Sequence, residues 1–145
     1  MTASLLHSRF RVAASRLSPA EFHVPITHNG FRLRLLPAGH IPGSAMLHVT
    51  RVADNATLLY TGDFKTRRSR TAEQVSFLSA DTLVMETTFA LPGYEFPNAM
   101  EIDGAILQFI HDSIADGETP VLLAYSLGKA QEAAALLAEH DIPLL

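Results

Sequence analysis

The first half of the chain alternates apolar and polar positions in short runs, which predicts β-strands. In the first run, Phe and Leu residues alternate with Arg32 and Arg34, so we expect a half-exposed strand with the arginines facing outward. The Asn29-Gly30 pair directly before it is a strong hairpin signal. We therefore expect residues 21–63 to form an antiparallel meander. The predicted strands are residues 31–35, 44–52 and 57–60.

The second half is dominated by helical spacing and uninterrupted apolar runs. Two runs, residues 81–85 and 120–125, predict short buried strands. Ser126 is a candidate N-cap for the helix that follows it, and Gly117 is expected to end the preceding one. Helices are predicted over residues 2–17, 99–115 and 127–140. This mixture predicts an α/β fold.

Composition limits the chemistry that is available. The 145 residues suit one ordinary domain or parts of two, and the net charge of −4 does not by itself indicate a nucleic-acid-binding protein. The chain has no cysteine, so any zinc site must use His, Asp and Glu. No apolar run approaches the roughly 18 residues of a membrane span, and the N-terminus has no signal-peptide core. We therefore expect a cytoplasmic protein with no membrane partner.

Three polar residues are candidates for a metal centre because each follows a predicted strand. His40 lies between two glycines, and it is either a metal ligand or a histidine that caps a turn. Asp63 follows an apolar run and either bridges two metal ions or caps a loop. Glu86 ends another run and either orients a ligand and assists proton transfer or is merely solvated.

Two further features are candidate contacts for phosphate. Ser126 and Lys129 lie where a strand would meet a helix, which suggests an anion site at the helix N-terminus or simply a capped helix. The segment is not a P-loop, because Leu123 stands where that motif requires glycine. A basic run follows Asp63 and consists either of solvated loop charges or of phosphate contacts. Its members are Lys65, Arg67, Arg68 and Arg70.

Four segments together resemble the β-CASP nucleases of the metallo-β-lactamase fold. Two of them look like the third and fourth metal motifs, one like the acidic motif that opens the β-CASP segment, and one like the first strand-helix unit of that segment. Within this group the chain is most similar to the DNA ligase-associated exonucleases, also called mRNA 3′-end-processing-factor-like proteins. The four segments are Pro37–Ala45, Leu59–Lys65, Asp81–Phe89 and Leu122–Glu132.

The resemblance implies a partial αββα metallo-β-lactamase sandwich over residues 1–90, followed by the beginning of a β-CASP domain over residues 91–145. It implies that His40 binds one of two zinc ions, that Asp63 bridges both and is catalytic, and that Glu86 supports catalysis. DNA or RNA would be the substrate and a DNA ligase a partner. Lys65, Ser126 and Lys129 would contact the nucleic acid.

The chain also departs from the family pattern. The His-x-His-x-Asp-His cluster, which supplies most of the metal ligands, is absent, and so are two later histidine motifs. We expect these to lie upstream of Met1 and beyond Leu145, and we expect the chain alone to bind zinc weakly and not to turn over. Two alternatives remain open: a metallo-β-lactamase-fold hydrolase acting on a small substrate, and a non-catalytic remnant or interaction module.

Overall fold

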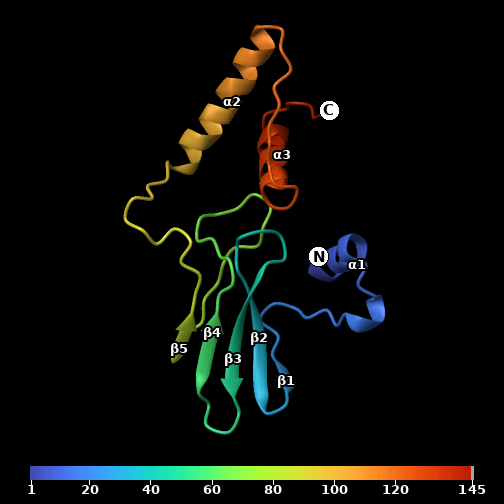
Figure 1. Cartoon of the computed structure of the whole chain (residues 1–145), viewed down its shortest axis with the longest axis vertical. Helices are drawn as coiled ribbons and strands as arrows, with labels where there is room; N and C mark the ends of the chain where they lie inside the picture. The colour runs from blue at the N-terminus through green and yellow to red at the C-terminus, as the bar shows by residue number, and fades with distance from the viewer. Residues whose placement is uncertain (145) are drawn as a thin grey trace. The chain divides into compact units, whose positions relative to one another are not determined.

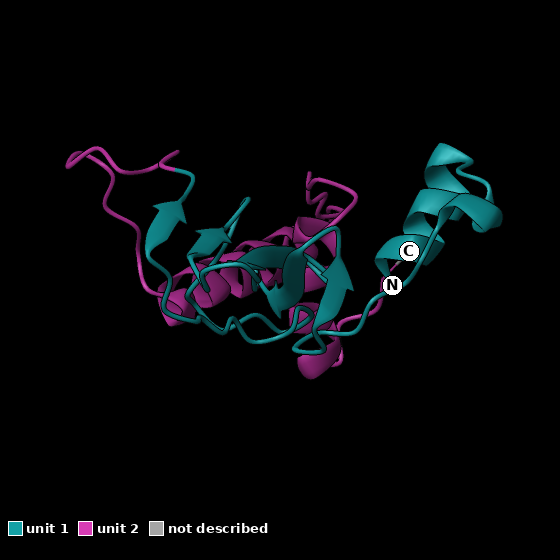
Figure 2. Ribbon diagram, turned by 90° about the horizontal axis from the view of Figure 1, so that it is seen from below, with its two compact units in different colours: residues 1–86 teal, residues 87–145 magenta. Residues whose placement is uncertain are grey.

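The computed structural model describes residues 1–144, which divide into two compact units. The first unit covers residues 1–86 and the second begins at Thr87 (Figure 2). Each unit is described by itself. The mixture of one sheet with several helices confirms the predicted α/β class. No helix among the described residues is long and apolar enough to cross a membrane.

The first unit is built on a five-stranded sheet with strands in sequence order (Figure 1). Its first four strands pair antiparallel, which confirms the predicted meander, whereas β5 runs parallel to β4. Asn29 and Gly30 form the predicted two-residue turn, and both have positive φ, of 46° and 79°, as a type I′ turn requires. The strands are β1 (Ile26–His28), β2 (Phe31–Pro37), β3 (Ala45–Arg51), β4 (Thr57–Tyr60) and β5 (Thr82–Val84).

One face of this sheet, here called the covered face, carries the hydrophobic core of the first unit. Directly paired residues share a face, so the register places the buried core side chains of β2, β3 and β4 together. The connection between β4 and β5 lies over them and contributes Phe64, Val75, Leu78 and Ala80. The buried core residues are Leu36, Ala38, Met46 and Leu59. Phe64 and Phe77 meet edge to face within the same connection.

The prediction that the arginines of β2 face away from the core is wrong, because both lie on the covered face: Arg32 is exposed near its margin, and the error is clearest at Arg34. Its partner in the sheet is the buried His48, so Arg34 lies on the covered face and is half-buried. Leu33 and Leu35 point to the opposite face, which is only partly shielded. Alternation separates two faces of a strand, but the connection between β4 and β5 decides which of them is covered.

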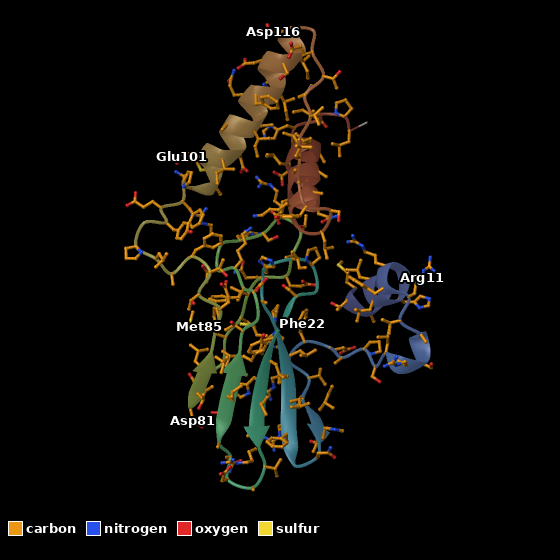
Figure 3. All side chains as sticks on the ribbon, viewed as in Figure 1. Arg11, Phe22, Asp81, Met85, Glu101 and Asp116 are labelled. Carbon is orange, nitrogen blue, oxygen red and sulfur yellow. The ribbon has the colours of Figure 1, made fainter. Side chains whose placement is uncertain are left out.

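The prediction of a buried strand over residues 81–85 is also wrong in part. A strand forms at Thr82–Val84, but it is the edge of the sheet, and Leu83 is 55% exposed. An uninterrupted apolar run is typical of a strand covered on both faces, and β5 has a neighbour on one side only. Figure 3 shows Asp81 at the start of β5 and Met85 just beyond its end.

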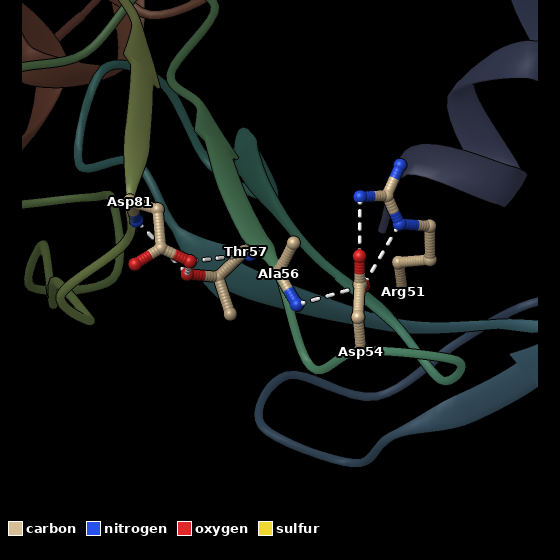
Figure 4. A network of polar contacts seen from close by, with 5 residues as sticks. All are labelled: Arg51, Asp54, Ala56, Thr57 and Asp81. Carbon is tan, nitrogen blue, oxygen red and sulfur yellow. Dashed lines mark hydrogen bonds and ion pairs between the residues drawn. The ribbon is translucent and has the colours of Figure 1, made fainter.

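Two aspartates bond neighbouring strands to each other through their side chains (Figure 4). The Asp54 carboxylate accepts hydrogen bonds from the Arg51 guanidinium and from Ala56 N, and these contacts lower the pKa of Asp54 to about 2. The Asp81 carboxylate accepts from Thr57 N at 2.8 Å and Thr57 Oγ1 at 2.7 Å, which lowers the pKa of Asp81. The first pair closes the hairpin between β3 and β4, and the second joins β4 to β5.

The N-terminal helix is shorter than predicted. Helix α1 (Thr2–Phe10) ends where Arg11 adopts a left-handed conformation, with φ of 54°, and a short 3-10 helix follows at Ala14–Arg16. The Thr2 hydroxyl donates to Gly43 O at 2.8 Å, so the start of α1 contacts the loop that follows β2. The predicted single helix over residues 2–17 is therefore interrupted.

The second unit contains two helices, α2 (Ala99–Ala115) and α3 (Lys129–Glu139). Helix α2 has the predicted bounds, a capping box between Asn98 and Glu101, and Gly117 at positive φ beyond its end. Helix α3 starts later than predicted, with Gly128 and not Ser126 as its N-cap. The predicted buried strand over residues 120–125 is wrong, since this segment forms no strand and Leu123 is 94% exposed.

Candidate metal centre at the strand ends

Three strands of the sheet point the same way and end at one edge. Strand β3 is antiparallel to both β2 and β4, and β5 is parallel to β4, so the carboxyl ends of β2, β4 and β5 lie together. His40, Asp63 and Glu86 each follow one of these ends by two or three residues. The topology therefore brings to one edge three residues that lie far apart in the sequence.

The loop that carries His40 is held by its own turn chemistry. Ser44 N donates to Ile41 O at 3.0 Å across Pro42 and Gly43, and Gly43 has a φ of 76°, as the third position of a type II turn requires. The Ser44 hydroxyl accepts from the backbone amides of His40 and Ile41, both at 3.2 Å. These bonds fix the backbone from which the imidazole projects.

The His40 loop is bonded directly to the Asp63 loop. Lys65 N donates to Ala38 O at 2.9 Å, which joins the residues just beyond β2 and β4. Gly39 has a φ of 72°, and a Cβ placed there would lie 2.6 Å from the Lys65 carbonyl oxygen. Glycine is required at this position by its backbone conformation and by the close approach of the neighbouring loop.

His40 and Asp63 form a pair at the surface of the first unit. Their Nε2 and Oδ2 atoms lie 3.9 Å apart, and the two side chains are 43% and 73% exposed. The predicted proximity is therefore present. Zinc ligands lie about 2.0–2.2 Å from the ion, so two ligands of one tetrahedral ion lie about 3.4 Å apart, and the separation of this pair is close to that spacing but wider. Among residues 1–144, however, no group of three or more such side chains comes together. The residues present supply two donors, and their metal role stays a prediction.

Glu86 is attached to the same edge through Thr61, a buried residue that is 1% exposed. The Thr61 hydroxyl donates to Gly62 O at 2.7 Å and accepts from Glu86 N at 3.3 Å, while Thr61 N donates to Val84 O at 3.0 Å. This side chain links the end of β4 to the end of β5. Sequence analysis missed both Thr61 and Ser44. The available signal was a hydroxyl residue beside glycine at each strand end.

The remaining candidates lie in different places. Lys65 belongs to the first unit and follows Asp63 by two residues. Ser126 and Lys129 belong to the second unit, before and at the start of α3. The Gln131 side chain accepts from Gly128 N and donates to Ser126 O at 3.0 Å, so it closes the turn that precedes this helix.

Comparison with known proteins finds relatives that match most of this chain. No family model matches the chain. The chain is 46% identical over 111 residues to a probable DNA ligase of Opitutus terrae, a match that covers 77% of this chain and 11% of that protein. It is 29% identical over 132 residues to the DNA cross-link repair protein SNM1 of Arabidopsis thaliana, covering 89% of this chain and 27% of that protein. The endoribonuclease YSH1 of Eremothecium gossypii is 29% identical over 127 residues, covering 86% and 16%.

The homologues of this chain are β-CASP nucleases of the metallo-β-lactamase fold. The resemblance drawn from the four sequence segments is thereby confirmed. The chain spans between 11% and 27% of the length of these three relatives. The β-CASP relatives are named for DNA ligation, DNA cross-link repair and RNA cleavage, so their printed activities all concern nucleic acids.

Proposed function

We propose that this chain supplies one side of a zinc-dependent β-CASP nuclease centre that cleaves phosphodiester bonds in DNA or RNA. The observation that carries the proposal is the His40–Asp63 pair, 3.9 Å apart at the edge where β2, β4 and β5 end. His40 would hold one zinc ion and Asp63 would bridge two. Bound zinc would lower the pKa of a water molecule and neutralise charge on the phosphoryl group.

The chain's own residues would position these groups. The Ser44 hydroxyl fixes the backbone that carries His40, and the Thr61 hydroxyl joins the backbone at Gly62, next to Asp63, to the backbone of Glu86. Glu86 would orient a ligand or carry a proton at its carboxylate, as acidic groups beside metal ligands do. The remaining zinc donors would come from other histidines and carboxylates, because this chain brings only two together among its described residues.

The wider assignments form part of the same proposal. Residues 1–90 would belong to the metallo-β-lactamase domain and residues 91–145 to the beginning of the β-CASP domain. Ser126 and Lys129 would contact the nucleic acid from the second. A DNA ligase would be a partner, which the name of one relative supports, and the protein would act in the cytoplasm.

A gel assay tests the proposal. Labelled single- and double-stranded DNA and RNA are incubated with zinc or manganese and with either this chain or a longer chain that includes a His-x-His-x-Asp-His segment and the later histidine motifs. We expect no cleavage by the 145 residues alone, since two donors fall short of the three or four that one zinc requires, and cleavage by the longer chain.

In the longer chain, Asp63→Ala should abolish cleavage because it removes the carboxylate shared by both ions. Asp116→Ala is the matched control, since this residue ends α2 in the second unit, and it should leave cleavage unchanged. Activity that survives Asp63→Ala would overturn the metal assignment. Chelator-sensitive cleavage by the 145-residue chain would overturn the expectation that the donors are incomplete.

A further inference from the structure

The connection between β4 and β5 contains a closed loop that starts beside Asp63. Lys65 N donates to Ala38 O at 2.9 Å, and Ser76 N donates to Pro37 O at 3.2 Å. Residues 65–76, here called the basic loop, therefore have both ends bonded to the backbone that leads from β2 to His40. Whatever the basic loop binds is held next to the His40–Asp63 pair.

The basic loop has internal order. The Ser69 hydroxyl accepts from Thr71 N at 3.1 Å and from Ala72 N at 2.8 Å, which folds the middle of the loop into a turn. The Glu73 carboxylate accepts from Gly43 N at 2.8 Å, so the far side of the loop is also bonded to the His40 loop. A loop of defined backbone holds its cations in place at a lower entropy cost than a flexible one.

The basic loop carries mostly positive charge. Glu73 is its single acid, and that carboxylate already accepts a hydrogen bond. The loop contains no aromatic side chain on which a base could stack. Its cations are Lys65, Arg67, Arg68 and Arg70, in a chain whose net charge is −4. Such a surface suits the phosphates of a nucleic-acid backbone and does not read bases.

We propose that the basic loop binds the backbone phosphates of a nucleic-acid strand beside the His40–Asp63 pair, with Lys65 and Arg68 as the contacts. The proposal rests on the proposed function for the identity of the substrate. Arg67 and Arg70 have other interactions in the structure, so the argument uses Lys65 and Arg68. Five residues span at most about 18 Å, so Arg68 holds a phosphate within a few nucleotides of one at Asp63.

Binding without metal tests this inference separately from catalysis. Fluorescence anisotropy is measured for the 145-residue chain with labelled oligo-dT and oligo-rU of about 20 nucleotides, in chelator, across a range of salt. Removing two phosphate contacts with Lys65→Ala/Arg68→Ala should flatten the slope of log affinity against log salt by roughly 1.4. Between about 50 and 200 mM salt, the unmodified chain should therefore lose about sevenfold more affinity than the variant.

The matched control is Arg16→Ala/Arg32→Ala, which removes the same charge from exposed positions outside the basic loop. It should leave the slope unchanged, and Lys65→Arg/Arg68→Lys should retain binding. An equal loss in the control, or no loss in either double variant, would overturn the inference. Competition by poly-glutamate as effective as by oligonucleotide would also overturn it. Loop-dependent binding together with an inactive longer chain would count against the nuclease proposal alone.

Discussion

Two glycines at the strand ends show how single residues shape the candidate site. Gly39 and Gly62 both have positive φ, of 72° and 54°, so any side chain at either position is strained. Only Gly39 also faces a neighbour, because its Cβ would lie 2.6 Å from Lys65 O, whereas nothing lies within 4 Å at Gly62. The contact at Gly39 joins the loops that carry His40 and Asp63.

Gly39→Ala should therefore destabilise the first unit more than Gly62→Ala. The left-handed backbone costs about 1 kcal/mol at either position, and the overlap at Gly39 adds about 1–3 kcal/mol more. Urea unfolding followed by circular dichroism would measure the difference. Equal decreases in the free energy of unfolding for the two variants would mean that the two loops do not meet as described.

Asp54 predicts a pH dependence for the hairpin between β3 and β4. Its pKa is lowered to about 2 by the Arg51 guanidinium and the Ala56 amide, below the value of about 3.9 in an unfolded chain. The stabilisation is therefore complete above about pH 4 and is lost as pH falls towards 2. The pKa of Asp81 is lowered as well, so its stabilising contribution also decreases as pH falls, but this contribution is common to both proteins when a variant of Asp54 is compared with the unmodified chain.

We expect Asp54→Asn to melt below the unmodified chain at pH 7, with a difference in melting temperature that becomes smaller as pH falls towards 2. Asparagine can still accept from Ala56 N but carries no charge for Arg51. Glu95→Gln, at an exposed position outside the hairpin, is the matched control and should melt at the same temperature as the unmodified chain at both pH values. A difference in melting temperature that is as large near pH 2 as at pH 7 would contradict the assigned role of the charge.

Among the elements, β5 depends most on side chains for its attachment to the sheet. It has three residues and one strand neighbour, and its start is bonded to β4 through Asp81 and Thr57. Its other end is bonded to β4 through Thr61. Glu86 follows β5 directly, so the placement of Glu86 depends on this short edge strand.

Asp81→Asn should loosen β5 without unfolding β2 and β3. The substitution removes the charge that accepts both Thr57 donors, and hydrogen bonds to a charged group are stronger than those to a neutral one. Hydrogen exchange should become faster at Thr61 N, which donates to Val84 O, while amides of β2 paired with β3 keep their protection. Uniformly faster exchange across the sheet would show a global and not a local effect.

At the scale of the whole molecule, one face of the sheet of the first unit is only partly shielded. It lies opposite the covered face and is here called the open face. Leu33 and Leu47 are half-buried and Val84 is 44% exposed, whereas Leu59 lies on the covered face and is buried. The sheet is therefore covered on one face and only partly shielded on the other. A sheet normally buries an apolar face against another layer of secondary structure.

Purified chain should bind a hydrophobic dye or self-associate through the open face. Ile26→Thr/Val84→Thr, which makes two exposed positions of this face polar, should reduce dye fluorescence. Val52→Thr, at an exposed position beyond the end of β3, is the control. A monomer that melts sharply and binds no dye would show that the first unit is self-sufficient.

Local sequence determined the meander, the Asn29-Gly30 turn and the bounds of α2, because each depends on neighbouring residues. It also marked His40, Asp63 and Glu86, since each follows an apolar run. Only the tertiary structure decided that these three lie at one edge of the sheet and that His40 and Asp63 meet there, because strand direction and register relate residues far apart in the chain. The covered face and the exposure of β5 were likewise decided by what packs against the sheet, and alternation within a strand carries no information about that.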